Sequence, residues 1–489
     1  MEGMEASPSS SAPSPHGPHA GCGIVPVHLL RRIAGGASPV AARAAQRSLE
    51  VGRELAGRRE ARTARTGRGP APGAPGAGST PTGTGATGTG PTGAAPTGAG
   101  ALPPHLQQRL AGPPASPLAA TGPRPAAEAS ASRRPDRRVH DAGGGTDLPG
   151  RPVRDEGAEP TGDVAADQAF DGLGATWQLY AHAFDRNSLD GAGLPLIASV
   201  HYGQDFQNAF WDGQQMIFGD GDGELFRGFT GAVDVIGHEL THGVVQYTAG
   251  LIYLAQPGAL HESIADCFGS MVKQDVLGQD AAEADWLIGA GLFTDAVHGV
   301  ALRSMKAPGT AYDDPVLGKD PQPDSMAHYA DLPHDAANDN GGVHINSGIP
   351  NRAFYLASTG IGGRTRDGAG QLWYDALTAP GLPRDADFAT FAALTLEAAA
   401  ARFGEDSTQR AAVAEAWQTV GVVVDAGLDR PGGRDRVVPV EVRPAGDEAC
   451  WLGELCPECG AMPEGEGARN PSVPCWRCGY VRAELGTDG

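Results

Sequence analysis

The stretch Val233-Asp-Val-Ile-Gly-His-Glu-Leu-Thr-His-Gly-Val-Val245 organises this chain of 489 residues. On a helix, His238 and His242 stand about one turn apart and project from the same face. That spacing lets both imidazoles bind one zinc ion and leaves Glu239 beside the water on the metal. The same short pattern also arises by chance, as two surface histidines and a solvated glutamate. The rest of the chain therefore has to supply a third ligand, an oxyanion donor and a substrate anchor.

The composition limits the organisation of the chain, which has room for roughly two to four domains. Its 72 glycines, 40 prolines and 6% aromatic residues indicate that a good part is not packed core. The net charge of −21 is uneven: residues 1–140 hold 16 Arg and 7 acidic residues (+9), and the remainder holds 21 basic and 51 acidic residues (−30). The asymmetry fits attraction between a basic front and an acidic body, or an ordinary Arg-rich tail.

Targeting signals are missing from the sequence pattern. No apolar run is long enough for a transmembrane helix. Residues 1–20 are rich in Ser, Pro, Gly and His and lack the apolar core of a secretory signal peptide. We therefore predict neither a membrane span nor a standard signal peptide.

Composition and hydrophobic periodicity divide the chain into segments. We predict an N-terminal tail and prosegment over residues 1–64, a low-complexity disordered linker with a processing site over 65–137, and a strand-rich lobe over 138–250. A helical lobe over 251–424, a second linker over 425–448 and a cysteine-bearing segment over 449–489 follow. Short apolar runs with Gly and Asp between them predict strands from Leu194 to Phe218. Helices are expected over residues 39–62, 170–184, 260–277, 345–358, 370–377, 388–403 and 410–422. Strands first and helices later predict an α+β fold.

A second helix supplies carboxylates near the histidine pair. The stretch Gly258–Gly269 has a helical pattern and places Glu262 twenty residues after His242. Glu262 completes a His-His-Glu zinc site with a fourth position open for water. Asp266 shares the face of Glu262 and can accept a hydrogen bond from the far nitrogen of a zinc-bound histidine. Alone, such a pair would be a solvated helix edge, but beside the two histidines it favours a metal site.

Together with four further stretches, these residues resemble the thermolysin family of zinc metalloendopeptidases. The stretches are Asn208-Ala-Phe-Trp211, Thr248-Ala-Gly-Leu-Ile-Tyr253, Leu302-Arg-Ser-Met305 and Gly341-Gly-Val-His-Ile-Asn-Ser-Gly348. The resemblance covers about residues 138–422 and 22–34, and within the family it indicates the protealysin-like branch, which has short prosegments and no signal peptide. It implies two lobes with a zinc cleft between them, and a zinc-dependent endopeptidase that is made as a zymogen and acts on proteins or peptides.

The resemblance also implies roles for matching residues. Zinc would be bound by His238, His242 and Glu262, with Glu239 as the general base. His344 and Tyr253 would donate hydrogen bonds to the oxyanion, and Asp339 would orient His344. The substrate main chain would be bound by Arg303, Asn208 and the backbone of Ala209. An apolar pocket on the primed side would be lined by Val235, Leu302 and Phe229, which implies a preference for a bulky hydrophobic residue after the cut.

Two departures from the family pattern lead to further hypotheses. Asp234, Asp266 and Asp285 suit a structural calcium site, but Lys273, Leu287 and Ala290 stand where calcium-rich members carry Glu. We expect the double-calcium site to be absent, with the ammonium group of the lysine in its place, and a single site elsewhere remains open.

The other departure lies in the prosegment, which carries Pro26-Val-His-Leu-Leu30 where the branch has Pro-Pro before an aliphatic residue. Residues 22–34 either dock as an apolar strand without contacting the metal, or occupy the cleft with Cys22 or His28 near the zinc. In both cases the prosegment would act as an intramolecular inhibitor. Activation would cut in the basic run 130–138 and free a body that starts near Val139.

Four cysteines near the C-terminus have zinc-ribbon spacing. Cys456 and Cys459 form one Cys-x-x-Cys pair, and Cys475 and Cys478 form another after fifteen intervening residues. Four thiolates close a tetrahedral structural zinc site. Two disulfides or an iron site are the alternatives, and the role of such a ribbon is open.

Two other functions fit parts of the sequence. A catalytically idle peptidase fold could serve binding or adhesion, with docking through the ribbon, but the complete set of catalytic residues disfavours this. Nucleic-acid binding is disfavoured by the acidic body and by a ribbon without a basic stripe. The family's extracellular role favours export by a non-classical route, with action in the cytoplasm as the alternative.

Overall fold

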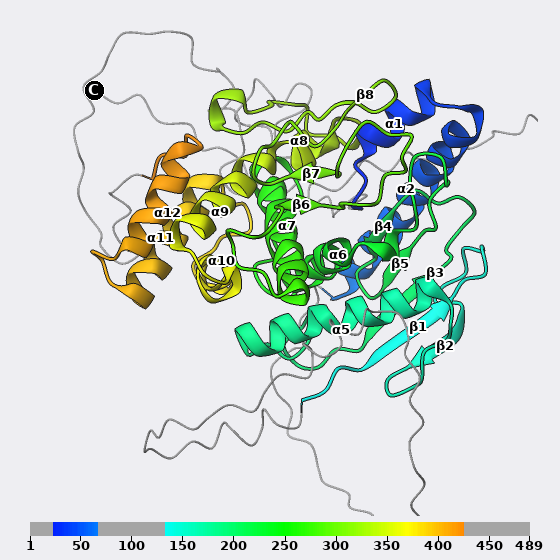
Figure 1. The fold of residues 1–489 in the computed structure, drawn as a ribbon, viewed down its shortest axis with the longest axis horizontal. Helices are drawn as coiled ribbons and strands as arrows, with labels where there is room; N and C mark the ends of the chain where they lie inside the picture. The colour runs from blue at the N-terminus through cyan, green and yellow to red at the C-terminus, as the bar shows by residue number, and fades with distance from the viewer. Residues whose placement is uncertain (1–22, 67–132, 425–489) are drawn as a thin grey trace, which may run out of the picture. The chain divides into compact units, whose positions relative to one another are not determined.

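The computed structural model describes residues 23–66 and 133–424, with side chains omitted for residues 55–66 (Figure 1). Most of the predicted linker 65–137 and the whole of 425–489 lie outside the described residues. The same holds for Cys22 and for the four cysteines of the predicted ribbon. Within the two described ranges, no helix has both the length and the apolar character needed to cross a membrane.

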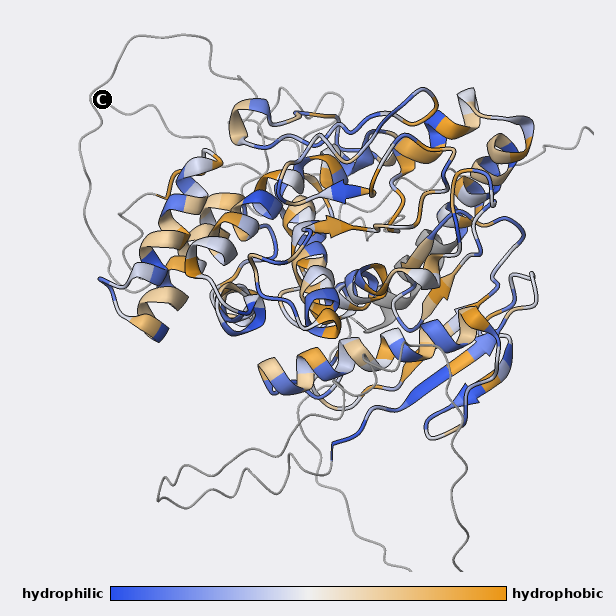
Figure 2. Cartoon of the chain, in the orientation of Figure 1, coloured by the Kyte–Doolittle hydropathy of each residue, from blue (hydrophilic) through white to orange (hydrophobic). Residues whose placement is uncertain are grey.

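The strand-rich lobe contains a five-stranded sheet with the order β2-β1-β3-β5-β4. Strands β1 to β5 span Arg137–Asp141, Arg151–Asp155, Leu196–Val200, Ala209–Trp211 and Met216–Phe218. β1 is antiparallel to β2 and parallel to β3, β3 is parallel to β5, and β4 is antiparallel to β5. β4 is thus an edge strand, with backbone groups available to a neighbouring chain. The strands predicted over 194–218 are confirmed, whereas β1 and β2, which are largely hydrophilic (Figure 2), were not predicted.

β1 bears on where activation can cut. Val139, at its centre, is fully buried and pairs with Arg154 on one side and Ala198 on the other. The carbonyl of Asp136 also accepts a hydrogen bond from the backbone of Leu196 at 2.7 Å. A body that started near Val139 would lose half of an inner strand. A cut that keeps the sheet whole therefore has to lie before Asp136.

Close packing of two helices brings the predicted zinc ligands together. α6 (Val233–Gln246) and α7 (Ala255–Leu277) lie side by side, and α5 (Val164–Phe184) packs against both and against the sheet (Figure 1). At Gly269 of α7, an added Cβ would lie 2.4 Å from the carbonyl oxygen of Asp234 and 3.0 Å from the backbone nitrogen of His238. At Gly237 of α6, a Cβ would lie 2.9 Å from Val272. Only glycine permits this approach, which sets the face of α7 that bears Glu262 against the histidine pair.

The second lobe is mainly helical, as predicted. Its helices α8 to α12 span Asp339–Asn346, Gly348–Ile361, Ala369–Thr378, Phe388–Phe403 and Thr408–Thr419. The helix expected over 345–358 is divided at Ser347 into α8 and α9. Short strand pairs β6–β7 (Leu287–Ile288, Arg303–Ser304) and β8–β9 (Asp313–Asp314, Gly318–Lys319) precede these helices. The 3-10 turns lie at Phe229–Gly231 (η1, before α6), Met326–His328 (η2), Ala336–Asn338 (η3) and Thr365–Asp367 (η4, between α9 and α10). This arrangement confirms the α+β, two-lobed expectation.

The prosegment is mostly helical and has no strand within its described residues 23–66, so the expectation of a docked strand over 22–34 is wrong there. α1 (Val27–Gly36) begins directly after Pro26, which is its N-cap and has an extended backbone, and the chain bends at Ile24 and Val25 just before it. Leu29, Leu30 and Ile33 recur at helical spacing and are buried in the main hydrophobic core. α2 (Pro39–Thr66) begins where predicted and ends four residues later than predicted.

Candidate active site

The pair of histidines on α6 faces a carboxylate on α7. The Nε2 atoms of His238 and His242 lie 3.0 Å apart. The oxygens of Glu262 lie 3.5 Å from the first Nε2 and 3.7 Å from the second, and all three side chains are almost fully buried. Ligands about 2.0–2.2 Å from a shared zinc ion are separated by distances of this size. Two imidazole nitrogens and a carboxylate aimed at one buried point suit a divalent cation, so these residues fit the expected metal.

The carboxylate of Asp266 connects the histidine pair to the helical lobe. His238 Nδ1 lies 2.8 Å from Asp266 Oδ1, which leaves Nε2 of the histidine to face the metal position. Arg303 donates two hydrogen bonds to this carboxylate, from Nε and a terminal nitrogen, each at 2.8 Å. Burial alone would raise the pKa of Asp266, but the guanidinium and His238 hold the pKa below its ordinary value. The aspartate therefore stays ionised.

A residue that the sequence analysis did not single out also holds this carboxylate. Asn351 is fully buried on α9 and donates from Nδ2 to Asp266 Oδ2 at 2.8 Å. It lies seven residues after His344, within one turn of the end of the Gly-Gly-Val-His stretch. An asparagine in an apolar helix face is the only sequence signal that could have indicated it.

Glu239 is held by the sheet. The backbone nitrogen of Trp211, at the end of β4, donates to Glu239 Oε2 at 3.0 Å. Atoms of His238, Glu239 and His242 lie within 4.8 Å of one another, so Glu239 is also close to the metal position. Its carboxylate is oriented by the edge strand, whereas both oxygens of Glu262 face the two imidazoles. Trp211 belongs to the stretch Asn208–Trp211 that resembles the family, but the sequence does not show which backbone amides act as donors.

A tyrosine and a histidine also converge on Glu262. The hydroxyl of Tyr253 donates to Glu262 and lies 3.3 Å from Nε2 of His344. Asp339 contacts His344 twice, at the ring Nδ1 (2.6 Å) and at the backbone nitrogen (2.8 Å). Burial lowers the pKa of a histidine, but Glu262 and Asp339 together raise the pKa of His344 to about 9. Both carboxylates therefore favour the protonated ring, in which Nδ1 and Nε2 are donors.

Local backbone geometry places this histidine. Asp339 and the following Asn340, Gly341 and Gly342 all have positive φ. Such a run turns the chain sharply before Val343, and glycine adopts it at little cost. The turn folds the Asp339 carboxylate back over the first regular turn of α8, onto His344. The predicted Asp339–His344 pair is thus a product of the Asp-Asn-Gly-Gly sequence.

The predicted substrate anchors contact the prosegment. The backbone nitrogen of Ile24 donates to the carbonyl of Ala209 at 3.1 Å, and Arg303 donates to the carbonyl of Ile24 at 3.1 Å. The Asn208 side chain accepts from the Val25 nitrogen at 3.0 Å and donates to the Val25 carbonyl at 3.1 Å. All four main-chain groups of two consecutive prosegment residues are therefore satisfied by these anchors.

Side chains of the prosegment enter the same region. His28, in the first turn of α1, is half-buried with its Nδ1 shielded from solvent, and burial lowers its pKa to about 4, with Asp339, His344 and Arg303 as its charged neighbours. Of the residues predicted to line an apolar pocket, Val235, Leu302 and Phe229 are all buried, in the hydrophobic core that also contains Ile24.

Lys273 lies among the carboxylates that suit calcium in the family pattern. Its Nζ is 2.9 Å from Asp285, 3.4 Å from Asp234 and 3.1 Å from the carbonyl of Leu287. Burial raises the pKa of Asp234, and the lysine counteracts this. Ala290 has no oxygen ligand in its side chain.

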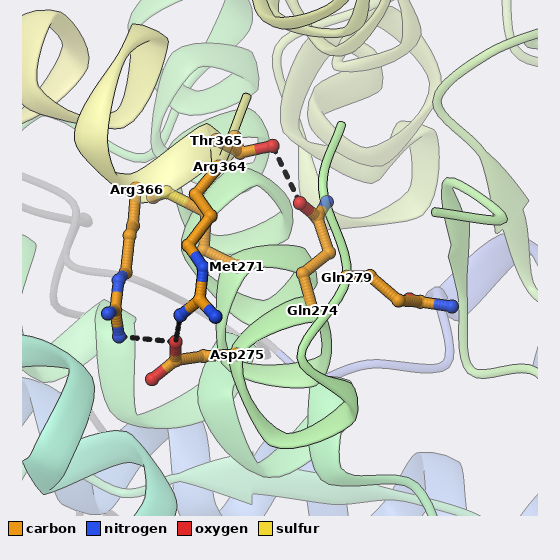
Figure 3. A pocket seen from close by; sticks show the side chains of 7 residues that line it. All are labelled: Met271, Gln274, Asp275, Gln279, Arg364, Thr365 and Arg366. Atoms are coloured by element: carbon orange, nitrogen blue, oxygen red, sulfur yellow. Dashed lines mark hydrogen bonds and ion pairs between the residues drawn. The ribbon is translucent and has the colours of Figure 1, made fainter. Parts of the chain in front are cut away.

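A separate hollow at the far end of α7 contains no predicted catalytic residue. Figure 3 shows its lining: Met271, Gln274, Asp275, Gln279, Arg364, Thr365 and Arg366. Arg366 and Arg364 both pair with Asp275, and Thr365 donates to Gln274 at 2.6 Å. These polar groups satisfy one another, as in a structural contact between α7 and η4.

Comparison with known proteins agrees with this geometry. Residues 138–246 match the family model of the thermolysin metallopeptidase catalytic domain, and residues 249–422 match that of its alpha-helical domain. An extracellular metalloprotease of Pectobacterium carotovorum is 55% identical over 289 residues, which is 59% of this chain and 82% of that protein. A thermolysin of Alicyclobacillus acidocaldarius is 39% identical, over 53% of this chain and 46% of that protein. The structure of the precursor of protealysin, a metalloproteinase from Serratia proteamaculans, is similar with a TM-score of 0.64 and 44% identity, covering 82% of this chain and all of that one. The chain belongs to the thermolysin family of zinc metalloendopeptidases.

Proposed function

We propose that His238, His242 and Glu262 hold the catalytic zinc ion and that Glu239 is the general base. Zinc, when bound, polarises the scissile carbonyl and acidifies the attacking water. Glu239 takes a proton from that water and delivers it to the leaving amine. The observation that carries this assignment is the convergence of two Nε2 atoms and a carboxylate at one buried point, with Glu239 fixed beside them by the Trp211 backbone.

The test of this assignment separates chemistry from metal binding. Glu239→Gln should retain one catalytic zinc per chain and lose at least about 1000-fold in kcat/KM on a quenched peptide. Glu262→Gln should lose the zinc itself. Zinc content by mass spectrometry and peptide hydrolysis are measured on the same samples. A Glu239→Gln enzyme of undiminished activity would exclude its role as the base.

Tyr253 and His344 are proposed as donors to the oxyanion of the tetrahedral intermediate. Both lie in the buried centre with their donor atoms 3.3 Å apart. Asp339 holds Nδ1 of His344 and so fixes the orientation of the ring, with Nε2 facing Tyr253. Preorganised donors of this kind typically contribute about 3–4 kcal/mol each to the stability of the transition state.

Substrates are proposed to bind as extended peptides along β4. Asn208, the Ala209 carbonyl and Arg303 would take the hydrogen bonds that they now make with the prosegment. Val235 and Leu302 would contribute to an apolar pocket for the residue after the cut, which favours bulky hydrophobic side chains there. The full burial of Ile24 beside these groups supports that preference.

The full-length chain is proposed to be latent. The prosegment satisfies the main-chain anchors, and further contacts secure it: Arg47 pairs with Asp205 at 2.7 Å, and Ser48 accepts from the Gln207 backbone at 2.8 Å. Cleavage before Asp136 would release the prosegment from the body. Peptide hydrolysis before and after a tryptic cut in the Arg-rich region tests this, and equal activity in both samples would exclude latency.

Two further metal assignments are proposals. The contacts of Lys273 with Asp234 and Asp285 support the absence of the double-calcium site, so calcium should leave the melting temperature unchanged. Residues Cys456, Cys459, Cys475 and Cys478 are proposed to bind a second, structural zinc ion. A Glu262→Gln chain should then still contain one zinc ion.

Action outside the cell is proposed from the relatives, two of which are named as extracellular metalloproteases. The alternative is action in the cytoplasm. Mass spectrometry of culture medium and cell lysate distinguishes the two, with the mature body expected in the medium.

A further inference from the structure

The prosegment crosses the active site with a defined direction. The backbone nitrogen of Ile24 donates to the Ala209 carbonyl, and the next residue, Val25, is held by the side chain of Asn208, which precedes Ala209. One chain thus ascends while the other descends, as in an antiparallel pair. Continued by one step, this pairing sends Gly23 towards Phe210 and the end of β4.

The general base lies at that end of the strand. Trp211, two residues after Ala209, donates its backbone hydrogen to Glu239. On the other side of the prosegment, the Arg303 side chain that binds the Ile24 carbonyl also binds Asp266. Since Asp266 contacts the predicted zinc ligand His238 directly, two residues, Arg303 and Asp266, connect the Ile24 carbonyl to the metal centre.

Gly23 itself is fitted to this position. A Cβ added to it would lie 2.8 Å from Nδ2 and 3.0 Å from Cγ of Asn208. The side chain that anchors Val25 therefore packs directly against the Gly23 backbone. Ile24 next to it is fully buried, and the two residues together present a small residue followed by a bulky apolar one.

We propose that the Gly23–Ile24 peptide bond occupies the scissile position and that the enzyme hydrolyses it once, in its own chain. The proposal rests on the catalytic assignment above and adds a second, internal substrate. The carbon–nitrogen bond between Gly23 and Ile24 breaks. Water supplies a hydroxyl group to the Gly23 carbonyl carbon and a hydrogen to the Ile24 nitrogen. The new carboxyl group then gives up its proton and the amine takes one up, so that the products are a carboxylate at Gly23 and an ammonium group at Ile24.

The product stays in place. Its contacts through Val25 and the buried face of α1, which includes Leu29 and Ile33, do not involve the broken bond. The segment that starts at Ile24 therefore remains as a bound product, and latency persists until the chain is cut again before Asp136. Intramolecular presentation makes the reaction first-order and independent of protein concentration.

The experiment uses the full chain, purified without metal and then loaded with zinc. Intact mass and N-terminal sequencing should show the loss of residues 1–23 and a new N-terminus at Ile24. The rate constant should be unchanged over an about 50-fold dilution, because a reaction between molecules would slow in proportion. Glu239→Gln should stay intact, Ile24→Leu should be cut, and Ile24→Asp should not, because a carboxylate replaces a buried apolar side chain.

A measurement without metal checks the docking itself. Amide hydrogen exchange should show Ile24 and Val25 protected in the metal-free chain, and Ile24→Asp should lose this protection. Should the Ile24→Asp prosegment detach completely, the Ile24→Leu and Glu239→Gln chains still provide the comparison. If the trypsin-activated form hydrolyses peptides but the Gly23–Ile24 bond of the zinc-loaded full chain stays intact, the inference of self-cleavage is overturned and the catalytic assignment stands. A trypsin-activated form without any activity would overturn the proposed catalytic assignment as well.

Discussion

Protonation of His28 should weaken docking of the prosegment. This side chain is half-buried in the neutral form, and burial lowers its pKa from 6.5 to about 4. Docking is therefore fully favourable above pH 6.5, where the free histidine is neutral, and weakens as the pH falls from 6.5 towards 4. At about pH 5, protonation of His28 shifts the docking equilibrium towards the undocked prosegment by a factor of about 30 relative to neutral pH, which is about 2 kcal/mol.

Other charged groups around His28 keep their state through this pH range. The pKa of Asp339 is lowered by His344 against the effect of burial, the pKa of His344 is about 9, and Arg303 is charged throughout. The pH dependence between about pH 5 and pH 8 should therefore come from His28. His28→Phe keeps an aromatic ring of similar shape at this position and removes the titration.

Amide hydrogen exchange over Ile24–Ile33 provides the assay, because it reports local opening of the docked segment. The ratio of wild-type to His28→Phe protection, taken at each pH, cancels the intrinsic pH dependence of exchange. This ratio should fall about 30-fold between pH 8 and pH 5. A ratio that stays constant within about threefold would refute the reasoning, since the half-buried histidine would then carry no titration penalty.

Three more predictions concern the body of the enzyme. Asn351→Leu should weaken zinc binding about 10-fold in a chelator competition, because Asp266 loses a donor, and unchanged affinity would deny Asn351 a positioning role. Gly269→Ala should lower the free energy of unfolding by about 1–3 kcal/mol in urea, because its Cβ would lie 2.4 Å from the Asp234 carbonyl, whereas Gly52→Ala, with no atom within 4 Å, should not. His201 has a pKa raised by Asp220 and Asp163, against the effect of burial, so its stabilisation is present below the ordinary pKa and lost as the pH rises through the raised one. His201→Asn should thus lower the melting temperature more at about pH 6 than at about pH 9, and an equal loss at both would contradict this.

The sequence was informative where chemistry requires particular residue types at a fixed spacing. His238, His242 and Glu262 met that condition, and the helices that carry them follow from apolar periodicity. β1 and β2 were missed because each contains mainly charged or polar residues, and one buried valine in β1 gives no alternating pattern. β1 is stabilised by neighbours on both sides and β2 by β1 alone, and a local reading of the sequence cannot detect such pairing.

Other features depend on contacts between distant parts of the chain. The Trp211 backbone donor could not be predicted, because every residue except proline has the same amide. The helix at Val27 was predicted as a strand because a short apolar run fits both structures until its neighbours are known. The placement of Asn351 beside Asp266 depends on how α9 packs against α7, which no motif records.

Latency and catalysis cannot be changed independently at the anchors that the prosegment and the substrate share. Asn208, Arg303 and the Ala209 carbonyl are proposed to bind both the prosegment and the substrate, so a variant of any of them weakens inhibitor and substrate together. Independent control lies in contacts away from these anchors, such as that of Arg47 with Asp205, and in prosegment residues that substrates lack. His28 is such a residue, since an extended substrate has no helix to direct a side chain back towards His344. The strength of latency can therefore be altered at position 28 without changing the catalytic residues.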